Sequence, residues 1–367
     1  MKIGVLGGGQ LGWMLGMAAE QLGIQCVFLD PNPECPAGRI GELIVADFSD
    51  SKALRQLAEE TDVITCEFEN VPAESLAMVS ESRPVHPSPH SFEVAQDRLV
   101  EKRFLDGVGL PVPAFSKVDS SEELPGAVER IGLPAVLKSR RGGYDGKSQV
   151  VLREESDIEG AFAEIGNGPA ILETMVSFEF EASVIVVRNQ DGEILTWDPI
   201  QNEHRSGILH RSICPCPGLD HSARLKMQAH AAEVVDKLNH VGVLTVEYFV
   251  IGENAWINEI APRVHNSGHL TIEYAATSQF ENHIRAIAGL KLGSTDPFFR
   301  GTSAVMGNVV GEWPSRNELL SIDMLRIHDY GKTPRPNRKI GHVTGIYGDI
   351  EWFNHAMEQI EHLLARD

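Results

Sequence analysis

Two glutamates, Glu247 and Glu259, interrupt apolar segments that are typical of β-strands. The segments are 242–250 (GVLTVEYFV) and 255–263 (AWINEIAPR), and Asn258 precedes the second glutamate. Burying a carboxylate is costly unless a cation compensates its charge. Carboxylates on adjacent strands offer the hard oxygen ligands with which proteins bind Mg²⁺ together with substrate phosphates. We therefore expect Glu247 and Glu259 to form a Mg²⁺ site; two exposed glutamates on an edge hairpin are the alternative.

A basic, glycine-rich segment at 137–147 (LKSRRGGYDGK) is the second group suited to chemistry. Lys138 ends a predicted strand. The glycines that follow allow backbone N–H groups to approach phosphate oxygens, and the cations would neutralise their charge. The segment is not a Walker A loop, because no Gly-Lys-Ser/Thr opens a helix. We expect a mobile loop that closes over a nucleotide, with an ordinary basic hairpin as the alternative.

The sequence GGGQLG at 7–12 matches the glycine pattern of dinucleotide-binding proteins, since it follows a predicted strand and precedes a helix. Asp30 ends the second predicted strand at the spacing of a ribose-binding acid. Taken alone, this pattern favours an NAD(P)-dependent oxidoreductase. The same turn would suit any phosphate at a helix N-terminus, or it could serve only close packing. Gln10 adds an amide that could contact a ligand.

Polar residues of four kinds follow the second glutamate strand directly. Arg263, His265, Asn266 and Ser267 place a cation, an imidazole, an amide and a hydroxyl beside the expected Mg²⁺ site. His265 and His269 also raise the alternative of a zinc site. That alternative is the weaker one, because the HExxH glutamate and the helical context are missing.

A second basic turn lies at 332–339 (KTPRPNRK), in a protein with a net charge of −20 (32 − 52). A surface this acidic argues against nucleic acid and against anionic membranes as partners. An anionic substrate would therefore need a local cluster of cations. The turn would provide one for a phosphate group, and a solvated basic loop is the alternative.

The length of 367 residues predicts two or three domains. No apolar run approaches the length of a membrane span. We expect no signal peptide, because the chain runs from Met1 straight into a strand and a glycine-rich turn. The odd number of cysteines, 5, favours reduced thiols. We therefore expect a cytoplasmic protein.

Strand and helix patterns alternate in the first part of the chain, which predicts a parallel sheet. Its strands are expected at 2–6, 25–30 and 62–66, its first helix at 10–22, and its boundary at the proline-rich stretch 83–89. One helix is expected at 92–107, followed by a small α/β unit at 114–174 with strands at 135–138, 149–152 and 170–173.

The remainder predicts an antiparallel sheet over 181–260 with a helix inserted at 223–239. Strands at 304–310 and 339–346 and a final helix at 351–365 complete the chain. The resulting domains are 1–96, 97–298 (with a lid at about 114–174) and 299–367.

Together these motifs resemble the ATP-grasp superfamily and, within it, the N5-carboxyaminoimidazole ribonucleotide synthase family of bacterial purine biosynthesis. The resemblance covers nearly the whole chain. It implies a mixed α/β (α+β) ATP-grasp fold with an N-terminal Rossmann-like parallel-sheet domain and a small C-terminal domain. The motifs that carry it are GGGQLG (7–12), EFENVP (67–72), GYDGK (143–147), NEIAPRVHNSGH (258–269) and RKIGH (338–342).

The resemblance also implies roles for individual residues. ATP would be bound by Arg98, Lys138, Gly143, Tyr144, Asp145, Gly146, Lys147, Ser148, Gln149, Glu173, Thr174, Met175, Val176, Glu181, His204, Asn258 and Glu259. The ribonucleotide would be bound by Gln10, Tyr144, Asp145, Arg263, His265, Asn266, Ser267, Lys332 and Arg338. Glu247 and Glu259 would ligate Mg²⁺, as one ion or two, or Mn²⁺ in its place. Three places depart from the family pattern: Trp13 stands where relatives often have Arg, Ser148 stands where Gly is common, and CPCP at 214–217 stands where a plainer Pro-Ala stretch is usual.

The activity implied is ATP-dependent carboxylation of 5-aminoimidazole ribonucleotide with bicarbonate through carboxyphosphate. The catalytic residues would be Lys138, Asp145, Arg263 and His265, with Asp145 as the base for the substrate amine. Relatives form homodimers, and we expect one here. A formate-dependent glycinamide ribonucleotide transformylase of the same superfamily and an NAD(P)-dependent oxidoreductase are the alternatives.

Overall fold

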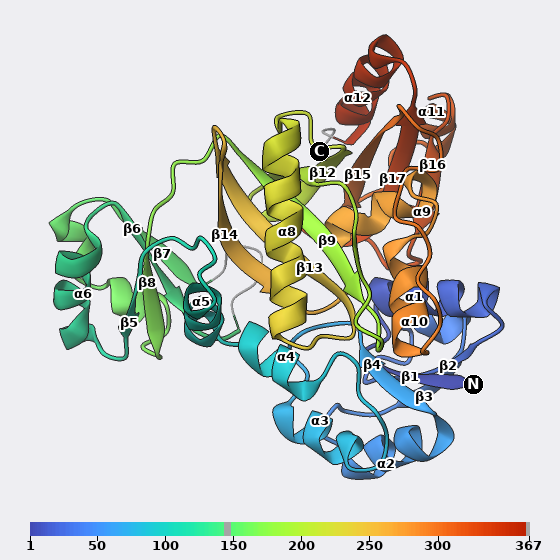
Figure 1. The fold of residues 1–367 in the computed structure, drawn as a ribbon, viewed down its shortest axis with the longest axis horizontal. Coiled ribbons are helices and arrows are strands. Elements are labelled where there is room, and N and C mark those ends of the chain that lie inside the picture. Colours follow the sequence, from blue (N-terminus) through green and yellow to red (C-terminus); the bar gives the residue numbers. More distant parts are fainter. Residues whose placement is uncertain (143–147, 365–367) are drawn as a thin grey trace.

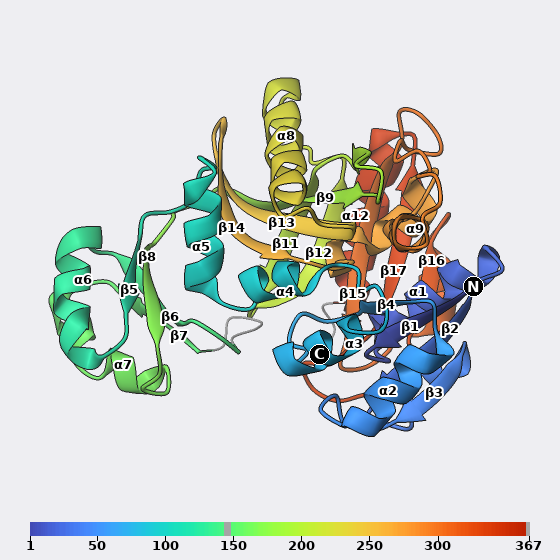
Figure 2. The same cartoon turned by 60° about the horizontal axis from the view of Figure 1, so that its bottom comes forward.

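The chain folds around three β-sheets (Figures 1 and 2). The structure, a computed structural model, describes residues 1–142 and 148–364. In both views the N-terminal part and a small sheet lie at opposite ends of the large central sheet. None of the helices in these two ranges combines the length and the apolar character that a membrane crossing requires.

The N-terminal part is a parallel sheet with the strand order β3-β2-β1-β4. The predicted parallel sheet is confirmed, but it has one more strand than expected. The missed strand, β3, lies at the sheet edge and is at most half-buried, so it lacks the apolar run of a buried strand. The elements are β1 (Lys2–Leu6), α1 (Gln10–Gln21), β2 (Gln25–Asp30), η1 (Pro36–Arg39), β3 (Glu42–Val45), α2 (Ser51–Glu60), β4 (Val63–Cys66), α3 (Ala73–Ser80) and α4 (Pro89–Ala95).

The single helix expected at 92–107 is wrong, because the chain forms two helices there, α4 and α5 (Arg98–Gly107). The break lies at Asp97. Its carboxylate accepts hydrogen bonds from the backbone N–H groups of Leu99 (3.0 Å) and Val100 (3.4 Å), which makes it the N-cap of α5. The cap turns α5 toward the central sheet.

The small sheet is antiparallel, with the order β5-β8-β6-β7. Three of its strands were expected, and β5 was missed. It encloses its own apolar core, with Leu137, Leu152 and Leu172 fully buried. The elements are β5 (Phe115–Val118), η2 (Ser121–Glu123), α6 (Leu124–Ile131), β6 (Ala135–Ser139), β7 (Gln149–Leu152), η3 (Glu155–Ile158), α7 (Ala161–Glu164) and β8 (Ala170–Thr174).

The central sheet is antiparallel, with the order β14-β13-β9-β11-β12-β15-β17-β16, and β10 pairs with β9. The C-terminal strands β15 to β17 therefore extend this sheet. Its strands are β9 (Phe180–Arg188), β10 (Ile194–Thr196), β11 (Ile200–Arg205), β12 (Ile208–Cys214), β13 (Gly242–Ile251), β14 (Asn254–Ala261), β15 (Ser303–Val310), β16 (Arg326–Asp329) and β17 (Lys339–Tyr347). Its helices are α8 (His221–Lys237), η4 (Asn266–Leu270), α9 (Thr271–Tyr274), α10 (Gln279–Ile287), α11 (Arg316–Leu320) and α12 (Ile350–Leu364). The predicted domain boundaries stay a prediction.

Alternation along β9 distinguishes the two faces of the central sheet. Val184 and Val186 pack in the apolar cluster that includes α8. Ile185 and Val187 pack in the cluster that includes α1 and α10. The two-residue period of the strand places Glu181 on this second face, where the polar pocket lies.

Candidate active site

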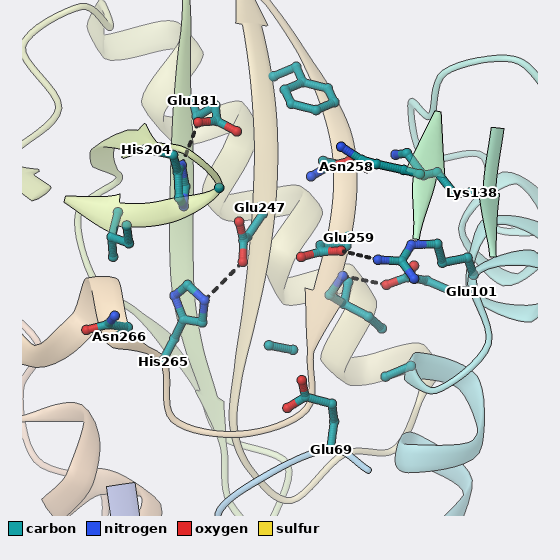
Figure 3. Close-up of a pocket in the computed structure, with 18 of the residues that line it drawn as sticks. Glu69, Glu101, Lys138, Glu181, His204, Glu247, Asn258, Glu259, His265 and Asn266 are labelled. Atoms are coloured by element: carbon teal, nitrogen blue, oxygen red, sulfur yellow. Dashed lines mark hydrogen bonds and ion pairs between the residues drawn. The ribbon is translucent and has the colours of Figure 1, made fainter. Parts of the chain in front are cut away.

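A pocket of about 520 Å³ lies between the small sheet, the central sheet and the N-terminal part. Figure 3 shows polar side chains from all three parts directed into it. The lining residues include many that were predicted: Gln10, Arg98, Lys138, Gln149, Glu173, Thr174, Met175, Val176, Glu181, His204, Glu247, Asn258, Glu259, Arg263, His265 and Asn266.

Glu247 and Glu259 are paired across β13 and β14. Tyr248 packs in the apolar core beneath α8, so the two-residue period turns Glu247 to the opposite face and into the pocket. The register shifts here, since Tyr248 pairs with Ile257, which leaves Asn258 as an extra residue on β14. Such bulges often lie beside active sites and redirect side chains.

The two carboxylates differ in how the protein balances their charges. Burial opposes ionisation of Glu247, but His265, His204 and Arg263 hold its pKa at about 2. The His265 Nε2 atom lies 3.0 Å from Glu247 Oε1. Burial and the charge of Glu247 instead raise the pKa of Glu259. Arg98 lies 3.9 Å from Glu259, so its cation compensates only part of this repulsion.

Lys138 projects from the end of β6 toward the same carboxylates. Its Nζ lies 2.8 Å from Glu173 Oε2. Burial opposes ionisation of Glu173, but Lys102 and Lys138 keep its pKa below the usual value. The Lys102 Nζ lies 3.8 Å from Glu173 Oε1, so one carboxylate holds two cations in place.

Helix α5 clamps the backbone of β14 around Glu259. The buried Lys102 donates to the carbonyl oxygens of Ile257 (3.1 Å) and Asn258 (2.6 Å). On the other side, Glu101 accepts from the Ile260 N–H at 2.5 Å. Neither Glu101 nor Lys102 was predicted. The signal in the sequence is two adjacent charges within the apolar pattern of the helix.

Aromatic and aliphatic side chains line another part of the pocket. Phe178 and Phe249 are stacked with their ring centroids 4.7 Å apart, and both line the pocket with Met175. His204 Nδ1 lies 2.6 Å from Glu181 Oε2, and although burial opposes it, Glu181 raises the pKa of His204. A flat aromatic ligand with a neighbouring hydroxyl would suit this end. The two phenylalanines were not predicted.

Arg263 is held by a carboxylate from the N-terminal part. Its Nε donates to Glu69 Oε2, and its Nη1 donates to the Val264 carbonyl oxygen at 3.0 Å. Burial lowers the pKa of Arg263, but the charge of Glu69 and its hydrogen bond raise it, and the net shift is upward. Glu69 was not predicted individually, although it belongs to the EFENVP motif.

The glycine-rich turn is occupied by the protein's own carboxylates. Glu67 accepts from the N–H groups of Gly9 and Gly12, each at 2.7 Å. Asp30 accepts from Gly8 N–H at 2.7 Å. A Cβ atom at Gly7 would lie 2.3 Å from Glu67 Cγ. The glycines therefore serve the close approach of Glu67, and the anion site at the α1 N-terminus is already filled.

The second basic turn meets the N-terminal part beside this carboxylate. Lys332 Nζ donates to Gln10 Oε1. Burial, Arg338 and Lys339 lower the Lys332 pKa to about 8, although Glu67 opposes the shift. Arg338 is half-buried and donates to the Thr333 carbonyl oxygen at 3.0 Å.

Trp13 packs at the same junction between the N- and C-terminal parts. The Arg39 guanidinium lies 4.8 Å from its ring centroid, and the Tyr330 ring lies edge-on at 6.4 Å. Arg39 Nη2 also donates to the Tyr330 carbonyl oxygen at 2.8 Å. Trp13 therefore joins two parts of the molecule.

Some predicted residues lie elsewhere or outside the described ranges. Gly143, Tyr144, Asp145, Gly146 and Lys147 fall between the described ranges. Ser148 has a φ of 56°, in the region that favours glycine.

Two other predicted residues lie behind the pocket. Ser267 is fully buried and bonds to His265 and Ser183. The His269 ring is tilted against the His342 ring, with 4.8 Å between ring centroids, so it does not converge with His265. Within the described ranges no cluster of His, Cys, Asp and Glu has the arrangement of a metal site with three such ligands.

Three family models match successive parts of the chain: the ribonucleotide synthetase preATP-grasp domain over 1–96, the ATP-grasp domain over 103–280, and the phosphoribosylaminoimidazole carboxylase C-terminal domain over 304–355. An N5-carboxyaminoimidazole ribonucleotide synthase of Pseudomonas aeruginosa is 45% identical over 364 residues, which cover 99% of either chain. The chain belongs to the N5-carboxyaminoimidazole ribonucleotide synthase family. It is therefore an ATP-grasp ligase, and the predicted family and fold are confirmed.

Solved structures of relatives have the same fold as this chain over its full length. The N5-carboxyaminoimidazole ribonucleotide synthetase of Thermus thermophilus has a TM-score of 0.95 at 44% identity, covering 100% of this chain and 99% of its own. The Aspergillus clavatus synthase, solved in complex with ADP and 5-aminoimidazole ribonucleotide, has a TM-score of 0.92 at 30% identity with the same coverage. Family membership thus decides against the oxidoreductase and the transformylase.

Proposed function

We propose that this pocket binds Mg·ATP, bicarbonate and 5-aminoimidazole ribonucleotide and forms N5-carboxyaminoimidazole ribonucleotide, ADP and phosphate. The observation that carries the proposal is the pairing of Glu247 with Glu259 in a pocket that also contains Lys138, Arg98 and Arg263. Like charges directly opposite each other in a sheet are destabilising, so a cation is expected between them. The Aspergillus clavatus synthase, solved with ADP and 5-aminoimidazole ribonucleotide, supports the nucleotide and the ribonucleotide of this proposal.

The ATP half lies between the small sheet and β13–β14. We assign the adenine to the side of the pocket with Phe178, Phe249 and Met175, and the ribose to Glu181. Lys138 and Arg98 would hold the phosphates. The donor set of Glu247 and Glu259 fits Mg²⁺, which would neutralise charge on the transferring phosphoryl group. Two ions, or Mn²⁺, belong to the same proposal.

Bicarbonate is a poor electrophile, and its attack on the γ-phosphorus would convert it to carboxyphosphate. Lys138 would stabilise negative charge during this transfer, and Arg263 would orient the bicarbonate-derived group. His265 and Asn266 would surround the aminoimidazole, while Lys332 and Arg338 would hold its 5′-phosphate, with Gln10 beside them.

The amine of the ribonucleotide would then attack carboxyphosphate, or CO₂ released from it, and lose one proton. Asp145 remains our predicted base for this proton. Asp145→Asn should slow carbamate formation far more than it weakens ATP binding, and a variant with unchanged turnover would reject the assignment. The homodimer and the cytoplasmic location also remain proposals.

Phosphate release from Mg·ATP and bicarbonate tests the function directly. Release should depend on 5-aminoimidazole ribonucleotide and should fall by about 10²-fold or more in Glu259→Gln, since an electrostatic group at the transferring phosphoryl is typically worth this much. Glu281→Gln is the matched control, because Glu281 pairs with Arg285 on the surface of α10. ATP turnover that ignores the ribonucleotide would reject the proposed substrate.

A further inference from the structure

A chain of hydrogen bonds runs from the pocket into the core behind it. His265 Nδ1 lies 2.8 Å from the Ser267 hydroxyl oxygen, which lies 2.8 Å from that of Ser183. Asn202 Nδ2 donates to Ser183 Oγ at 2.9 Å, and Ser212 Oγ donates to Asn202 Oδ1 at 2.8 Å. The three serines are fully buried, and Asn202 is 5% exposed.

The backbone determines the direction of this chain at the pocket end. The Ser267 N–H donates to His265 Nδ1 at 3.3 Å. A backbone N–H can only donate, so Nδ1 must offer its lone pair and carries no proton. The Ser267 hydroxyl, on the same nitrogen, is then also a donor.

Each remaining hydrogen bond follows from this one. Since the Ser267 hydroxyl donates to His265, its oxygen must accept from the Ser183 hydroxyl. Ser183 in turn accepts from the Asn202 amide, and the Asn202 carbonyl accepts from Ser212. If the Asn202 amide were rotated by 180°, every hydrogen bond in the series would run in the opposite direction. A proton would then lie on His265 Nδ1, toward which the Ser267 N–H already points.

These hydrogen bonds determine which nitrogen of the His265 ring, which faces Glu247, carries the proton. With Nδ1 unprotonated, the ring proton lies on Nε2, 3.0 Å from Glu247 Oε1. We propose that Ser183, Asn202 and Ser212 are positioning residues that fix His265 as the Nε2–H tautomer, so that it holds one oxygen of Glu247 and leaves the other for the cation. The inference rests on Glu247 as a cation ligand, the function proposed above.

Strand pairing in the central sheet brings the residues of this hydrogen-bond series together. Ser183 on β9 pairs with Glu247 on β13, and Asn202 on β11 pairs with Ser212 on β12. Small polar residues thus follow one another across neighbouring strands beneath the pocket. Partners that orient a ligating carboxylate are typically worth about 10- to 100-fold in metal affinity.

The tautomer can be read from the ¹⁵N resonances of the histidine rings in the protein without nucleotide or metal. His265 is assigned by its loss in His265→Gln. We expect an unprotonated Nδ1 and a protonated Nε2. In Asn202→Asp, which can only accept, Ser183 must donate to the new carboxylate, and Nδ1 should gain proton occupancy.

Ser183→Ala and Ser183→Thr separate positioning from folding. Ser183→Ala should weaken Mn²⁺ binding in the presence of ADP about tenfold, measured by electron paramagnetic resonance, because Ser267 loses its donor. Ser183→Thr keeps the hydroxyl and should bind as wild type. Ser75→Ala, which removes a buried serine bonded to the Phe48 carbonyl oxygen, is the control for loss of a buried hydroxyl alone.

A protonated Nδ1 in the wild-type protein would overturn the inference. So would a folded Ser183→Ala that keeps both the tautomer and the Mn²⁺ affinity. If Ser183→Ala and Asn202→Asp do not fold, the wild-type spectrum still decides. The spectrum requires no substrate, so its failure would leave the carboxylation assay untouched, and failure of that assay would leave the tautomer standing.

Discussion

Glu247 and Glu259 face each other, yet their pKa values shift in opposite directions. Burial raises the pKa of Glu247, but the hydrogen bond from His265 and the neighbouring His204 and Arg263 lower it to about 2. Burial and the charge of Glu247 raise the pKa of Glu259, although Arg98 and Lys138 oppose this shift. The protein therefore stabilises the ionised form of Glu247, whereas Glu259 would need an additional positive charge to be stabilised in the same way. A bound divalent cation would supply it, which is the physical basis of the proposed Mg²⁺ site.

The pKa of Lys332, lowered to about 8, predicts a pH dependence for the ribonucleotide. The ammonium form, present below this pH, attracts the 5′-phosphate, and the neutral form above it does not. The kcat/KM for 5-aminoimidazole ribonucleotide should therefore fall as the pH rises from about 7 to about 9, since kcat/KM reports the free enzyme. Lys332→Arg stays charged and should flatten this fall. An equally steep fall in Lys332→Arg would assign the titration to another group.

At this scale the sequence predicted many of the side chains that line the pocket, because polar residues within apolar strands stand out. It did not predict Glu101, Lys102 or Glu69. Lys102 acts on backbone carbonyls 155 and 156 residues away in the chain, and such a contact leaves no local pattern. The glycine pattern suggested a dinucleotide for a related reason: the carboxylate that fills the turn, Glu67, lies 55 residues beyond Gly12.

Among the elements, α5 and β14 form the unit that positions Glu259. At the bulge, the carbonyl groups of Ile257 and Asn258 both face α5, and Lys102 donates a hydrogen bond to each. The helix could not be placed correctly from its apolar spacing, because the cap at Asp97 breaks that spacing without a proline or glycine. Edge strands such as β3 were missed for want of a long apolar run.

Lys102→Met should loosen this unit. It removes two hydrogen bonds and leaves the buried Glu173 with one cation fewer, a change that typically costs about 3 to 5 kcal/mol. We expect a lower midpoint of urea unfolding and a higher KM for ATP. Lys237→Met, at an exposed site in the last turn of α8, is the matched control. Should Lys102→Met unfold at the wild-type urea concentration, the clamp would contribute little.

Across the whole molecule, the proposed phosphate site lies where the N-terminal part meets the C-terminal strands. Gln10 and Lys332, which are 322 residues apart, meet there, and Trp13 packs beside them against Arg39. The order of strands could be anticipated for each part separately. The pairing of β12 with β15, which joins the two parts into one sheet, could not be anticipated, because neither strand carries a sequence pattern that identifies its neighbour.

Trp13→Ala should affect the ribonucleotide more than ATP. The contact of Trp13 with Arg39 is worth about 1 kcal/mol, so its loss should raise the KM for 5-aminoimidazole ribonucleotide about three- to tenfold. The KM for ATP should stay nearly unchanged, because the nucleotide end of the pocket lies against the small sheet. Trp352→Ala, at a site 65% exposed on α12, is the control. Equal effects on both KM values would show that Trp13 supports the fold in general.

Transfer of ¹⁸O from labelled bicarbonate to phosphate tests the proposed path through carboxyphosphate. The enzyme would be supplied with ATP, Mg²⁺, 5-aminoimidazole ribonucleotide and [¹⁸O]bicarbonate, and the released phosphate examined by ³¹P NMR. Because a bicarbonate oxygen attacks the γ-phosphorus, each phosphate should carry one ¹⁸O atom from bicarbonate. Phosphate whose new oxygen comes from water would rule out carboxyphosphate as the intermediate.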